Sequence, residues 1–395
     1  MSGKARIAGV GMVPFATPSK AAPYDVLATG AVKAALSDAG VDYDAIQQAY
    51  VGYVYGDSTC GQNALYNVGL TGIPVVNVNN NCSTGSSALW LARQAVESGA
   101  ADVVLALGFE QMQRGALGSH WDDRPSPFGR FDETLNRVQG PAPENTPLAP
   151  RYFGGAGEAY REKYGLGDDV FARIAVKART HAANNPYSVF RDPISLDDVL
   201  GSPQIYGPLT RLQCCPPTCG AAAAVLVSPA YAAKHGLRAN VQISAQAMTT
   251  DRPSSFETDL MRLVGFDMAR EAADQVYETA GVAPEDIRVV ELHDCFTTNE
   301  LLTYEALRLT PEGTAEKFIL DGDNTYGGRV VTNPSGGLLS KGHPLGATGL
   351  AQCAELVWQL RGEAGPRQVE GVNVALQHNL GLGGAAVVSL YEKVA

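Results

Sequence analysis

The sequence has no long apolar run, and this absence argues against a membrane-spanning helix. No segment approaches the ~20 consecutive apolar residues that a helix needs to cross a bilayer. Charge is also scarce: 18% of the 395 residues are Asp, Glu, Lys or Arg, whereas 45% are hydrophobic. That balance excludes a disordered chain. The length is too great for one hydrophobic core and predicts two or three domains.

An excess of positive charge is missing as well. The formal net charge is −11 at pH 7, which argues against general binding to nucleic acid or anionic membranes. A local basic patch for a phosphorylated ligand remains compatible with it. The first residues lack the apolar segment of a signal peptide, and the last ones do not form a peroxisomal signal. Seven cysteines is an odd number, so we expect reduced thiols in a soluble, cytoplasmic protein.

One cysteine lies where a strand is expected to lead into a helix. Cys82 follows the apolar run 73–78 and precedes residues 86–99, where apolar side chains recur at helical spacing up to a glycine. Backbone N–H groups and the dipole at a helix start lower the pKa of a thiol. The position therefore favours Cys82 as a nucleophile, although an isolated free cysteine is more often an inert buried residue.

The chain repeats itself in two places, the first at an offset of 241 residues. Residues 39–46 recur as 280–287, and residues 223–228 resemble residues 385–390. Each copy combines a helix, a glycine stop and a buried strand, which is typical of a sheet covered by helices. The repeat therefore predicts two similar α/β halves.

The repeat also pairs Cys82 with His343, because each precedes a helix in its own half. If the halves pack about a pseudo-twofold axis, the thiol and the imidazole face each other. The dipole at the helix start would keep His343 neutral and able to accept a proton.

The stretch 116–207 differs from both halves in composition. Proline, glycine and aromatic residues are frequent, and helical spacing is confined to residues 156–164 and 169–183. A long irregular insertion usually covers or shapes a substrate site. We therefore expect an N-terminal half over 1–115 and 208–238, a loop (lid) domain over 116–207, and a C-terminal half over 239–395.

Two further polar segments each follow an expected strand. His293, Asp294 and Cys295 lie after the strand 287–292, at a strand end of the kind that binds ligands in α/β folds; taken alone they fit equally well as helix-capping and core residues. The glycine-rich segment 377–384 follows the strand 372–376. It suits either an oxyanion hole or a tight turn. It is no dinucleotide fingerprint, because a strand follows it.

A cluster of three cysteines invites a metal or redox interpretation. Cys214, Cys215 and Cys219 have no second Cys/His cluster to complete a ligand set. We therefore do not expect a metal site there, and their role is left open.

Four segments together resemble the motifs of the thiolase superfamily. They are residues 80–85 (NNCSTG), 293–296 (HDCF), 342–349 (GHPLGATG) and 378–381 (HNLG). The resemblance covers essentially the whole chain and is strongest to the thiolases of the sterol-carrier-protein-X type. It implies an α/β thiolase fold with two repeated βαβαβαββ halves and an inserted loop domain, assembled as a homodimer or a dimer of dimers.

The resemblance also implies an activity and a co-substrate. It implies an acyltransferase that cleaves 3-oxoacyl-CoA with free coenzyme A, or runs the reverse Claisen condensation. No cofactor is bound permanently and no metal is needed. In this interpretation Cys82 takes the acyl group and His343 accepts the thiol proton.

The remaining roles follow from the same resemblance. Classical members carry a second cysteine where this chain has Asn379, and the resemblance transfers its acid–base work to Cys295. His293 replaces the asparagine that holds an oxyanion-hole water. The backbone N–H groups of Cys82 and Gly381 form the other oxyanion hole, and His378 and Asn379 are candidate substrate contacts.

Three functions are therefore weighed. The first is a 3-oxoacyl-CoA thiolase acting on medium-chain, methyl-branched or sterol side-chain substrates. The second is a thiolase-fold aldolase or condensing enzyme that works with a partner protein; such relatives often lose the cysteine or histidine that this chain keeps as Cys82 and His343. The third is a non-catalytic lipid-binding protein. Residues 116–148 resemble the family least, so the acyl chain is not identified by sequence.

Overall fold

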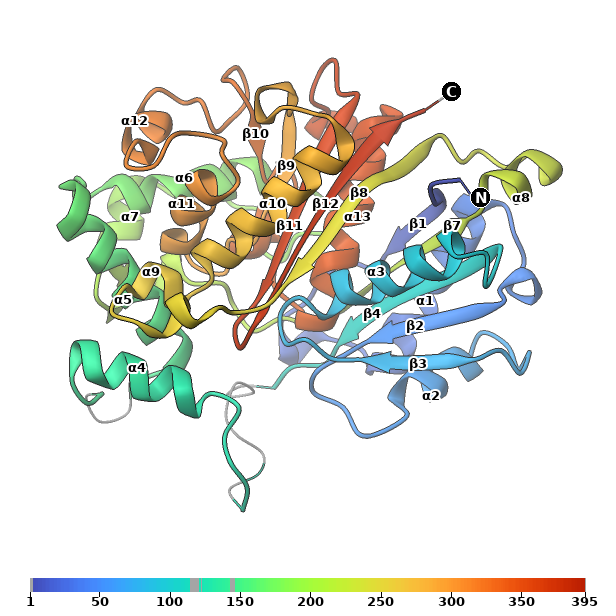
Figure 1. Cartoon of the computed structure of the whole chain (residues 1–395), viewed down its shortest axis with the longest axis horizontal. Coiled ribbons are helices and arrows are strands. Elements are labelled where there is room, and N and C mark those ends of the chain that lie inside the picture. Colours follow the sequence, from blue (N-terminus) through green and yellow to red (C-terminus); the bar gives the residue numbers. More distant parts are fainter. Residues whose placement is uncertain (1–2, 114–120, 122, 143–145, 395) are drawn as a thin grey trace.

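The computed structural model describes residues 3–113, 121, 123–142 and 146–394. The N-terminal part of the fold alternates strands and helices before it ends on two strands (Figure 1). Its elements are β1 (Arg6–Met12), α1 (Tyr24–Ala39), β2 (Gln48–Gly52), α2 (Cys60–Tyr66), β3 (Val75–Val78), α3 (Thr84–Glu97), β4 (Val103–Glu110) and β7 (Gly220–Val227).

The second part repeats this pattern apart from two additional short helices, α9 (Leu260–Leu263) and α12 (Ala315–Leu320). Its elements are β8 (Val241–Thr249), α10 (Phe266–Ala280), β9 (Val289–Glu291), α11 (Thr297–Ala306), α12 (Ala315–Leu320), β10 (Val331–Thr332), α13 (Leu345–Arg361), β11 (Val374–Gly381) and β12 (Ala385–Lys393). Both parts read βαβαβαββ, so the predicted fold class is confirmed.

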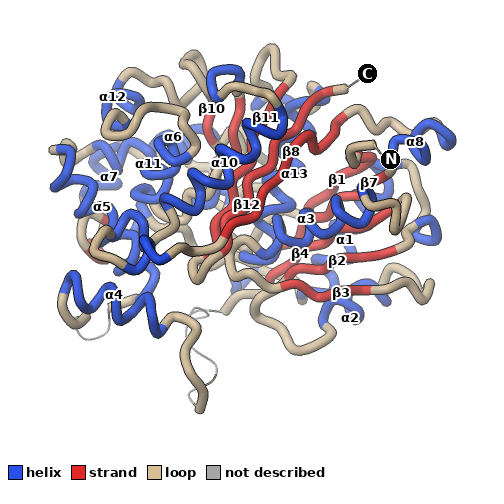
Figure 2. Tube along the Cα trace, in the orientation of Figure 1, coloured by secondary structure: helices blue, strands red, loops and turns tan. Residues whose placement is uncertain are grey.

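The strands form one ten-stranded sheet within the described residues, in the order β10-β9-β11-β12-β8-β1-β7-β4-β2-β3. Corresponding strands hold corresponding places on either side of the centre. There β1 and β8 pair antiparallel through Arg6 with Gln242 and Ile7 with Val241. Figure 2 shows the strands running side by side through the molecule, with helices around them. The sequence repeat thus becomes a pseudo-twofold arrangement.

The central strands are buried on both faces, which explains why their sequences lack alternation. In β4, Leu105 and Leu107 pack in the cluster that contains α1, whereas Val104 and Ala106 pack in the cluster that contains α3 and α13. Helix α13 is buried almost throughout its length. A helix that is apolar all round is typical of such a central position.

The starts of α3 and α13 meet at the centre of the molecule. A Cβ atom on Gly85 would lie 2.6 Å from the carbonyl oxygen of Gly346, and one on Gly108 would lie 2.1 Å from the same oxygen. Only glycine permits so close an approach of two backbones. These glycines therefore bring the two helix starts together.

The segment between β4 and β7 holds the inserted elements. They are α4 (Gly129–Gln139), α5 (Leu148–Tyr164), α6 (Val170–Ala182), α7 (Leu196–Leu200), β5 (Gln204–Tyr206) and β6 (Leu209–Thr210). The four helices gather beside the second half in Figure 1. The rings of Phe153 and Phe296 stack there at 5.0 Å between centroids. The proposed domain limit at 115/116 lies outside the described residues, and the three-part division stays a proposal.

Two elements are longer than the sequence predicted. Helix α5 begins at Leu148 rather than at residue 156, because Pro150 lies in the first helical turn, where a missing N–H costs nothing. Strand β11 continues to Gly381 rather than ending at Leu376. The polar letters of His378 and Asn379 concealed it, although both residues are fully buried. Among the described residues, no helix has both the length and the apolar character needed to cross a membrane.

Candidate active site

A tight turn presents Cys82 just before α3. Asn81 adopts a left-handed backbone conformation, with φ of 51°, which asparagine tolerates better than most residues. The Thr84 hydroxyl donates to the Asn81 carbonyl at 2.6 Å and accepts from the Asn80 N–H at 2.9 Å. The turn is thereby fixed, and Cys82 stands two residues ahead of the first helical residue.

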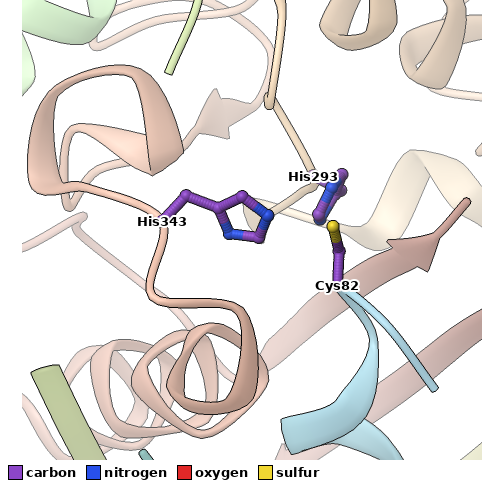
Figure 3. A group of neighbouring side chains, drawn as sticks. All are labelled: Cys82, His293 and His343. Carbon is purple, nitrogen blue, oxygen red and sulfur yellow. The ribbon is translucent and has the colours of Figure 1, made fainter. Parts of the chain in front are cut away.

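His343 stands at the corresponding place in the other half, two residues ahead of the first residue of α13. The structure brings both side chains together with His293. Ligand atoms of Cys82, His293 and His343 all lie within 4.8 Å of one another. Figure 3 shows the Cys82 sulfur beside both imidazole rings. The two histidine rings meet edge to face, with centroids 5.0 Å apart.

These groups line a cavity of about 250 Å³ whose wall is mostly apolar. The first and second halves and the inserted segment all contribute to it. Apolar and aromatic lining residues include Tyr55, Met112, Phe128, Leu148, Phe153, Phe296, Leu380 and Leu382. The polar members are few and converge at one place. Such a wall excludes water and strengthens electrostatic interactions inside it.

His343 is held as a neutral base. Its Nδ1 lies 2.7 Å from the Thr348 hydroxyl, and that hydroxyl donates its own proton to the Pro344 carbonyl at 3.0 Å. Nδ1 must therefore carry the ring proton, which leaves a lone pair on Nε2. Nε2 is buried and has no hydrogen-bond partner among the described residues. Burial lowers the pKa of His343 to about 3. This favours the neutral form that the sequence predicted, but the cause is burial and not the helix dipole.

The prediction of a lowered pKa for Cys82 is wrong. Burial of the thiol, and secondarily the Glu110 carboxylate, raise the pKa of Cys82 to about 12. Desolvation of a thiolate outweighs the favourable helix start. Cys82 therefore rests as a thiol, and it would have to lose its proton before its sulfur could act as a nucleophile. His343 Nε2 is the acceptor available for that proton.

Cys295 lines the same cavity and is 4% exposed. Burial, together with the neighbouring Cys215, Cys82 and Asp294, raises its pKa well above the usual thiol value. A neutral thiol that holds its proton so firmly is suited to protonating a carbanion. Its thiolate, once formed, is a strong base. Four cysteines line the cavity. Among them, Cys295 is the residue to which the family resemblance assigns the acid–base role.

His293 is fully buried apart from its cavity face, and its pKa lies well below the usual value through burial and the nearby His343 and His378. The side-chain amide of Asn379 lies 3.0 Å from His293 Nδ1 and donates to the Cys82 carbonyl at 3.1 Å. Asn379 thus contacts both catalytic segments rather than the cavity. His293 enters the site as a neutral ring.

The structure places His378 behind the site, whereas Gly381 lies between two residues of the cavity wall, Leu380 and Leu382. His378 is fully buried, and its Nδ1 faces the His293 backbone N–H at 3.5 Å. It does not line the cavity, so a direct contact with substrate is not expected. Gly381 lies against the turn that presents Cys82, which we call the nucleophile turn. A Cβ atom on Gly381 would come within 2.2 Å of the Asn80 carbonyl oxygen.

The contact at Gly381 gives a testable prediction. Gly381→Ala is expected to push the nucleophile turn aside and to lower kcat/KM by roughly 10²-fold, a typical effect of an ångström-scale misplacement. Overpacking of this kind also costs about 1–3 kcal/mol of stability. Enzyme kinetics and urea unfolding measure both effects. Gly129→Ala is the matched control, because its Cβ would meet nothing within 4 Å; equal behaviour of the two variants contradicts the prediction.

Two family models match the sequence. The thiolase N-terminal domain matches residues 6–229, and the thiolase C-terminal domain-like model matches residues 250–392. The chain belongs to the thiolase family. It is therefore classed with the acyltransferases. Sterol carrier protein 2 of Homo sapiens is 56% identical over 98% of this chain and 71% of its own length. Non-specific lipid-transfer protein-like 2 of Caenorhabditis elegans is 46% identical over 98% of this chain and 96% of its own length.

A solved structure extends the comparison. The Ltp2–ChsH2(DUF35) aldolase has a TM-score of 0.84 and 27% identity, and covers 99% of this chain and 98% of the compared chain. The thiolase fold is thus shared with an enzyme whose name describes a different reaction. The family assignment is settled by these matches, whereas the reaction has to be argued from the site.

Sequence reasoning missed one carboxylate of this thiolase site. Glu110, at the end of β4, accepts backbone N–H groups of Val54 at 3.1 Å, Tyr55 at 2.9 Å and Gly346 at 3.0 Å. It joins the cavity residue Tyr55 to the start of α13. No local pattern indicates this role, because the partners are backbone groups of remote segments.

Glu110 gives a pH prediction. Burial raises its pKa from 4.5 to about 7. Between these values the folded state binds more protons than the unfolded state, so stability falls as pH rises through this window. The contribution is about 3 kcal/mol. The free energy of unfolding, measured with urea at about pH 4.5 and pH 8, should therefore fall less between these pH values in Glu110→Gln than in the wild type. The exposed Glu133→Gln serves as control, and an unchanged pH slope in Glu110→Gln contradicts the assignment.

A second missed carboxylate supports His343 from the HDCF segment. Asp294 is fully buried and accepts the backbone N–H groups of Leu338 at 2.7 Å and Leu339 at 3.3 Å. These residues form the π-helical turn that leads to His343. Asp294 thus holds the turn that leads to His343, a contact that the sequence did not indicate. It connects the segment of His293 and Cys295 to that of His343.

The three clustered cysteines do not gather into a ligand set within the described residues. Cys219 donates to the Met112 carbonyl at 3.4 Å, and Cys214 donates to the Thr210 carbonyl at 3.3 Å. Cys214 and Cys215 line the cavity, whereas Cys219 lies in the core. Their side chains therefore serve as part of the wall and the core.

Proposed function

We propose that this thiolase-family protein is a 3-oxoacyl-CoA thiolase that uses coenzyme A as co-substrate. One observation carries the proposal: a nucleophile, a neutral base, a second thiol and a further imidazole meet in one apolar cavity. Retro-Claisen cleavage needs a sulfur nucleophile, an acid for the departing carbanion and donors for two oxyanions. In this proposal the side chains of Cys82, Cys295 and His293 and two backbone N–H groups meet these needs, with His343 as the base for the nucleophile.

The first half-reaction forms the acyl-enzyme. Cys82 Sγ attacks the 3-oxo carbon of the substrate, and His343 Nε2 takes the thiol proton. The bond between C2 and C3 then breaks, the acyl group stays on sulfur, and its electron pair forms the enolate of the leaving thioester. Cys295 donates its proton to C2, which completes acetyl-CoA or its substituted form.

The second half-reaction returns the enzyme to its resting state. The Cys295 thiolate takes the proton of the coenzyme A thiol, whose sulfur attacks the acyl group on Cys82. Cys82 leaves as thiolate and recovers its proton from His343. In this scheme the N–H groups of Cys82 and Gly381 stabilise the oxyanion at the acyl carbon, and His293 stabilises the enolate oxygen.

The wall of the cavity supports an apolar acyl group as part of the proposal. Phe128, Leu148 and Phe153 come from the inserted segment and face the catalytic groups. Medium-chain, methyl-branched or sterol side-chain acyl groups fit a wall of this chemistry. A role in fatty-acid β-oxidation or sterol degradation is therefore proposed for the reaction.

The alternative is an aldolase or condensing enzyme that acts with a partner protein. The similarity to the Ltp2–ChsH2(DUF35) aldolase favours it. The presence of both Cys82 and His343 favours the thiolase, because an aldol cleavage needs no acyl-enzyme. A non-catalytic lipid-binding protein, the third candidate, has no use for either residue. Intact-mass detection of an acyl group on Cys82 after mixing with acyl-CoA separates the thiolase from both.

A cleavage panel tests the proposal directly. Linear, 2-methyl and steroid 3-oxoacyl-CoAs are offered with free coenzyme A, and loss of the enolate absorbance is followed. Coenzyme A-dependent cleavage of at least one class, absent without coenzyme A, is the expected result. The matching 3-hydroxyacyl-CoAs, offered without coenzyme A, test the aldolase, because aldol cleavage needs a 3-hydroxyl group and no acyl acceptor; their cleavage would support the aldolase instead.

The assembly is proposed to be a homodimer or a dimer of dimers. Among the described residues, β3 pairs on one side only, with β2, and is the edge of the sheet. The exposed apolar residues Tyr66, Leu70 and Val76 lie in or near this edge. Unpaired strand edges invite pairing with another chain. We also propose a cytoplasmic location, because all seven cysteines are free thiols.

A further inference from the structure

The two active-site histidines receive different hydrogen-bond partners at Nδ1. For His343 the partner is a hydroxyl whose own proton is used elsewhere, so Nδ1 donates. For His293 the partner is the amide nitrogen of Asn379, at 3.0 Å. An amide nitrogen only donates, so Nδ1 of His293 accepts. A neutral ring carries one proton, which for His293 therefore lies on Nε2.

The orientation of the Asn379 amide is fixed by its other contacts. Its nitrogen faces the Cys82 carbonyl at 3.1 Å, and a carbonyl only accepts. Its oxygen accepts from the Ser86 hydroxyl at 2.9 Å. A flipped amide would set two oxygens against each other at Cys82. Asn379 is fully buried, so water does not replace a lost partner.

The direction of the bonds continues into the core. Gln377 donates to Ser86 at 2.9 Å and to the Gly349 carbonyl at 2.6 Å, so the Ser86 hydroxyl accepts from Gln377 and donates to Asn379. The Tyr391 hydroxyl donates to the oxygen of Gln377. Each member of this chain of donors is buried. The proton position on His293 is thus imposed from the sheet beneath the site.

We propose that Asn379 is a positioning residue that holds His293 in its Nε2–H form, so that the ring acts as a hydrogen-bond donor in the cavity and not as a ligand. Nε2 of His343 then carries a lone pair and accepts a proton, whereas Nε2 of His293 carries a proton and donates a hydrogen bond. The catalytic meaning of the donor, stabilisation of the enolate oxygen, rests on the proposed thiolase function. The proton position itself does not.

The same assignment explains how the site discriminates against metal ions. A cysteine sulfur and two imidazole nitrogens, all within 4.8 Å of one another, resemble three zinc ligands. A ring nitrogen that carries a proton cannot bind a metal, and moving that proton to Nδ1 would break the bond from Asn379. Wild-type protein therefore offers two ligands, Cys82 and His343, and binds zinc weakly.

Asn379→Asp tests the proposal by reversing the bond. An aspartate of the same shape accepts from His293 Nδ1–H, which frees Nε2 as a ligand, as in carboxylate–histidine–zinc arrangements. We expect zinc to bind this variant 10–100-fold more tightly than wild type, in line with the known weight of such outer partners. Thiolysis should fall roughly 10²–10³-fold through loss of one oxyanion donor. Asn373→Asp, at an exposed position, controls for the added charge.

Nitrogen-15 spectra of histidine-labelled protein read the proton position directly, with His293→Asn to assign the signal. The expected result is an Nε2–H ring in wild type and an Nδ1–H ring in Asn379→Asp. An Nδ1–H ring in the wild type overturns the proposal, and so does unchanged zinc affinity in a folded Asn379→Asp protein. If that variant does not fold, the wild-type spectrum alone decides. An Nε2–H ring in a protein without thiolysis supports the proposal and refutes the proposed function.

Discussion

Cys82→Ser is expected to abolish coenzyme A-dependent cleavage, with a fall on the order of 10⁴–10⁶-fold, as for the loss of other covalent nucleophiles. Serine keeps the shape of the turn but offers a hydroxyl whose pKa lies far above that of a thiol. His343, whose pKa burial lowers to about 3, is too weak a base to compensate. Steady-state rates with a 3-oxoacyl-CoA and intact-mass measurement of the acyl adduct check this.

A cysteine away from the cavity provides the control for that experiment. Cys60 is buried in α2 and is not part of the cavity wall. Cys60→Ser should keep both the acyl adduct and the cleavage activity. Full cleavage by Cys82→Ser would refute the nucleophile assignment and with it the proposed thiolase mechanism. Loss of the adduct in both variants would point to damage of the fold instead.

Cys295→Ser is expected to separate the two chemical tasks. Cys82 and His343 remain in place, so transfer of an acyl group from acyl-CoA to Cys82 should continue. Cleavage of the carbon–carbon bond should fall roughly 10²–10⁴-fold, the usual contribution of a general acid or base. The deciding measurement is deuterium incorporation at C2 of acetyl-CoA in heavy water. In this scheme acylation of Cys82 releases coenzyme A, which takes the Cys295 proton, and the Cys295 thiolate then exchanges the protons at C2 of a second acetyl-CoA.

Cys215 is the rival for this role, because it lines the same cavity and its backbone N–H donates to the Cys295 carbonyl at 2.9 Å. Deuterium exchange that survives in Cys295→Ser but disappears in Cys215→Ser would transfer the acid–base role to Cys215. Exchange lost only in Cys295→Ser supports the scheme. Both variants keep a hydroxyl of nearly the size of the thiol, so cavity collapse does not confuse the comparison.

The pairing of Cys82 with His343 was predictable because a repeat and two helix starts are visible in the sequence. The structure brings the two side chains together, as that pairing implied. His293 and Cys295 were identified only through the family resemblance, since their letters fit helix-capping and core roles equally well. Their place on the cavity wall agrees with the resemblance.

The misses have a common physical origin in tertiary burial. The pKa of Cys82 depends on how densely its surroundings pack, and a local motif does not contain that information. The predicted strand at β11 ended too early, because His378 and Asn379 are polar residues whose hydrogen-bond partners lie in other segments. Glu110 and Asp294 act on backbone N–H groups 236 and 44 residues away. Every residue except proline has a backbone N–H group, so the sequence does not indicate which of these groups a buried carboxylate binds.

The β1–β8 junction joins two halves that hold different parts of the chemistry. Among the described residues, two residue pairs set the register of β1 against β8. Cys82 comes from one half, and His343, His293 and Cys295 come from the other. Neither half contains a complete site, although each repeats the same architecture. Turnover therefore reports on docking of the whole molecule: during refolding, secondary structure can return in each half before any activity does, and activity appears only when the glycine-lined helix starts have closed on each other.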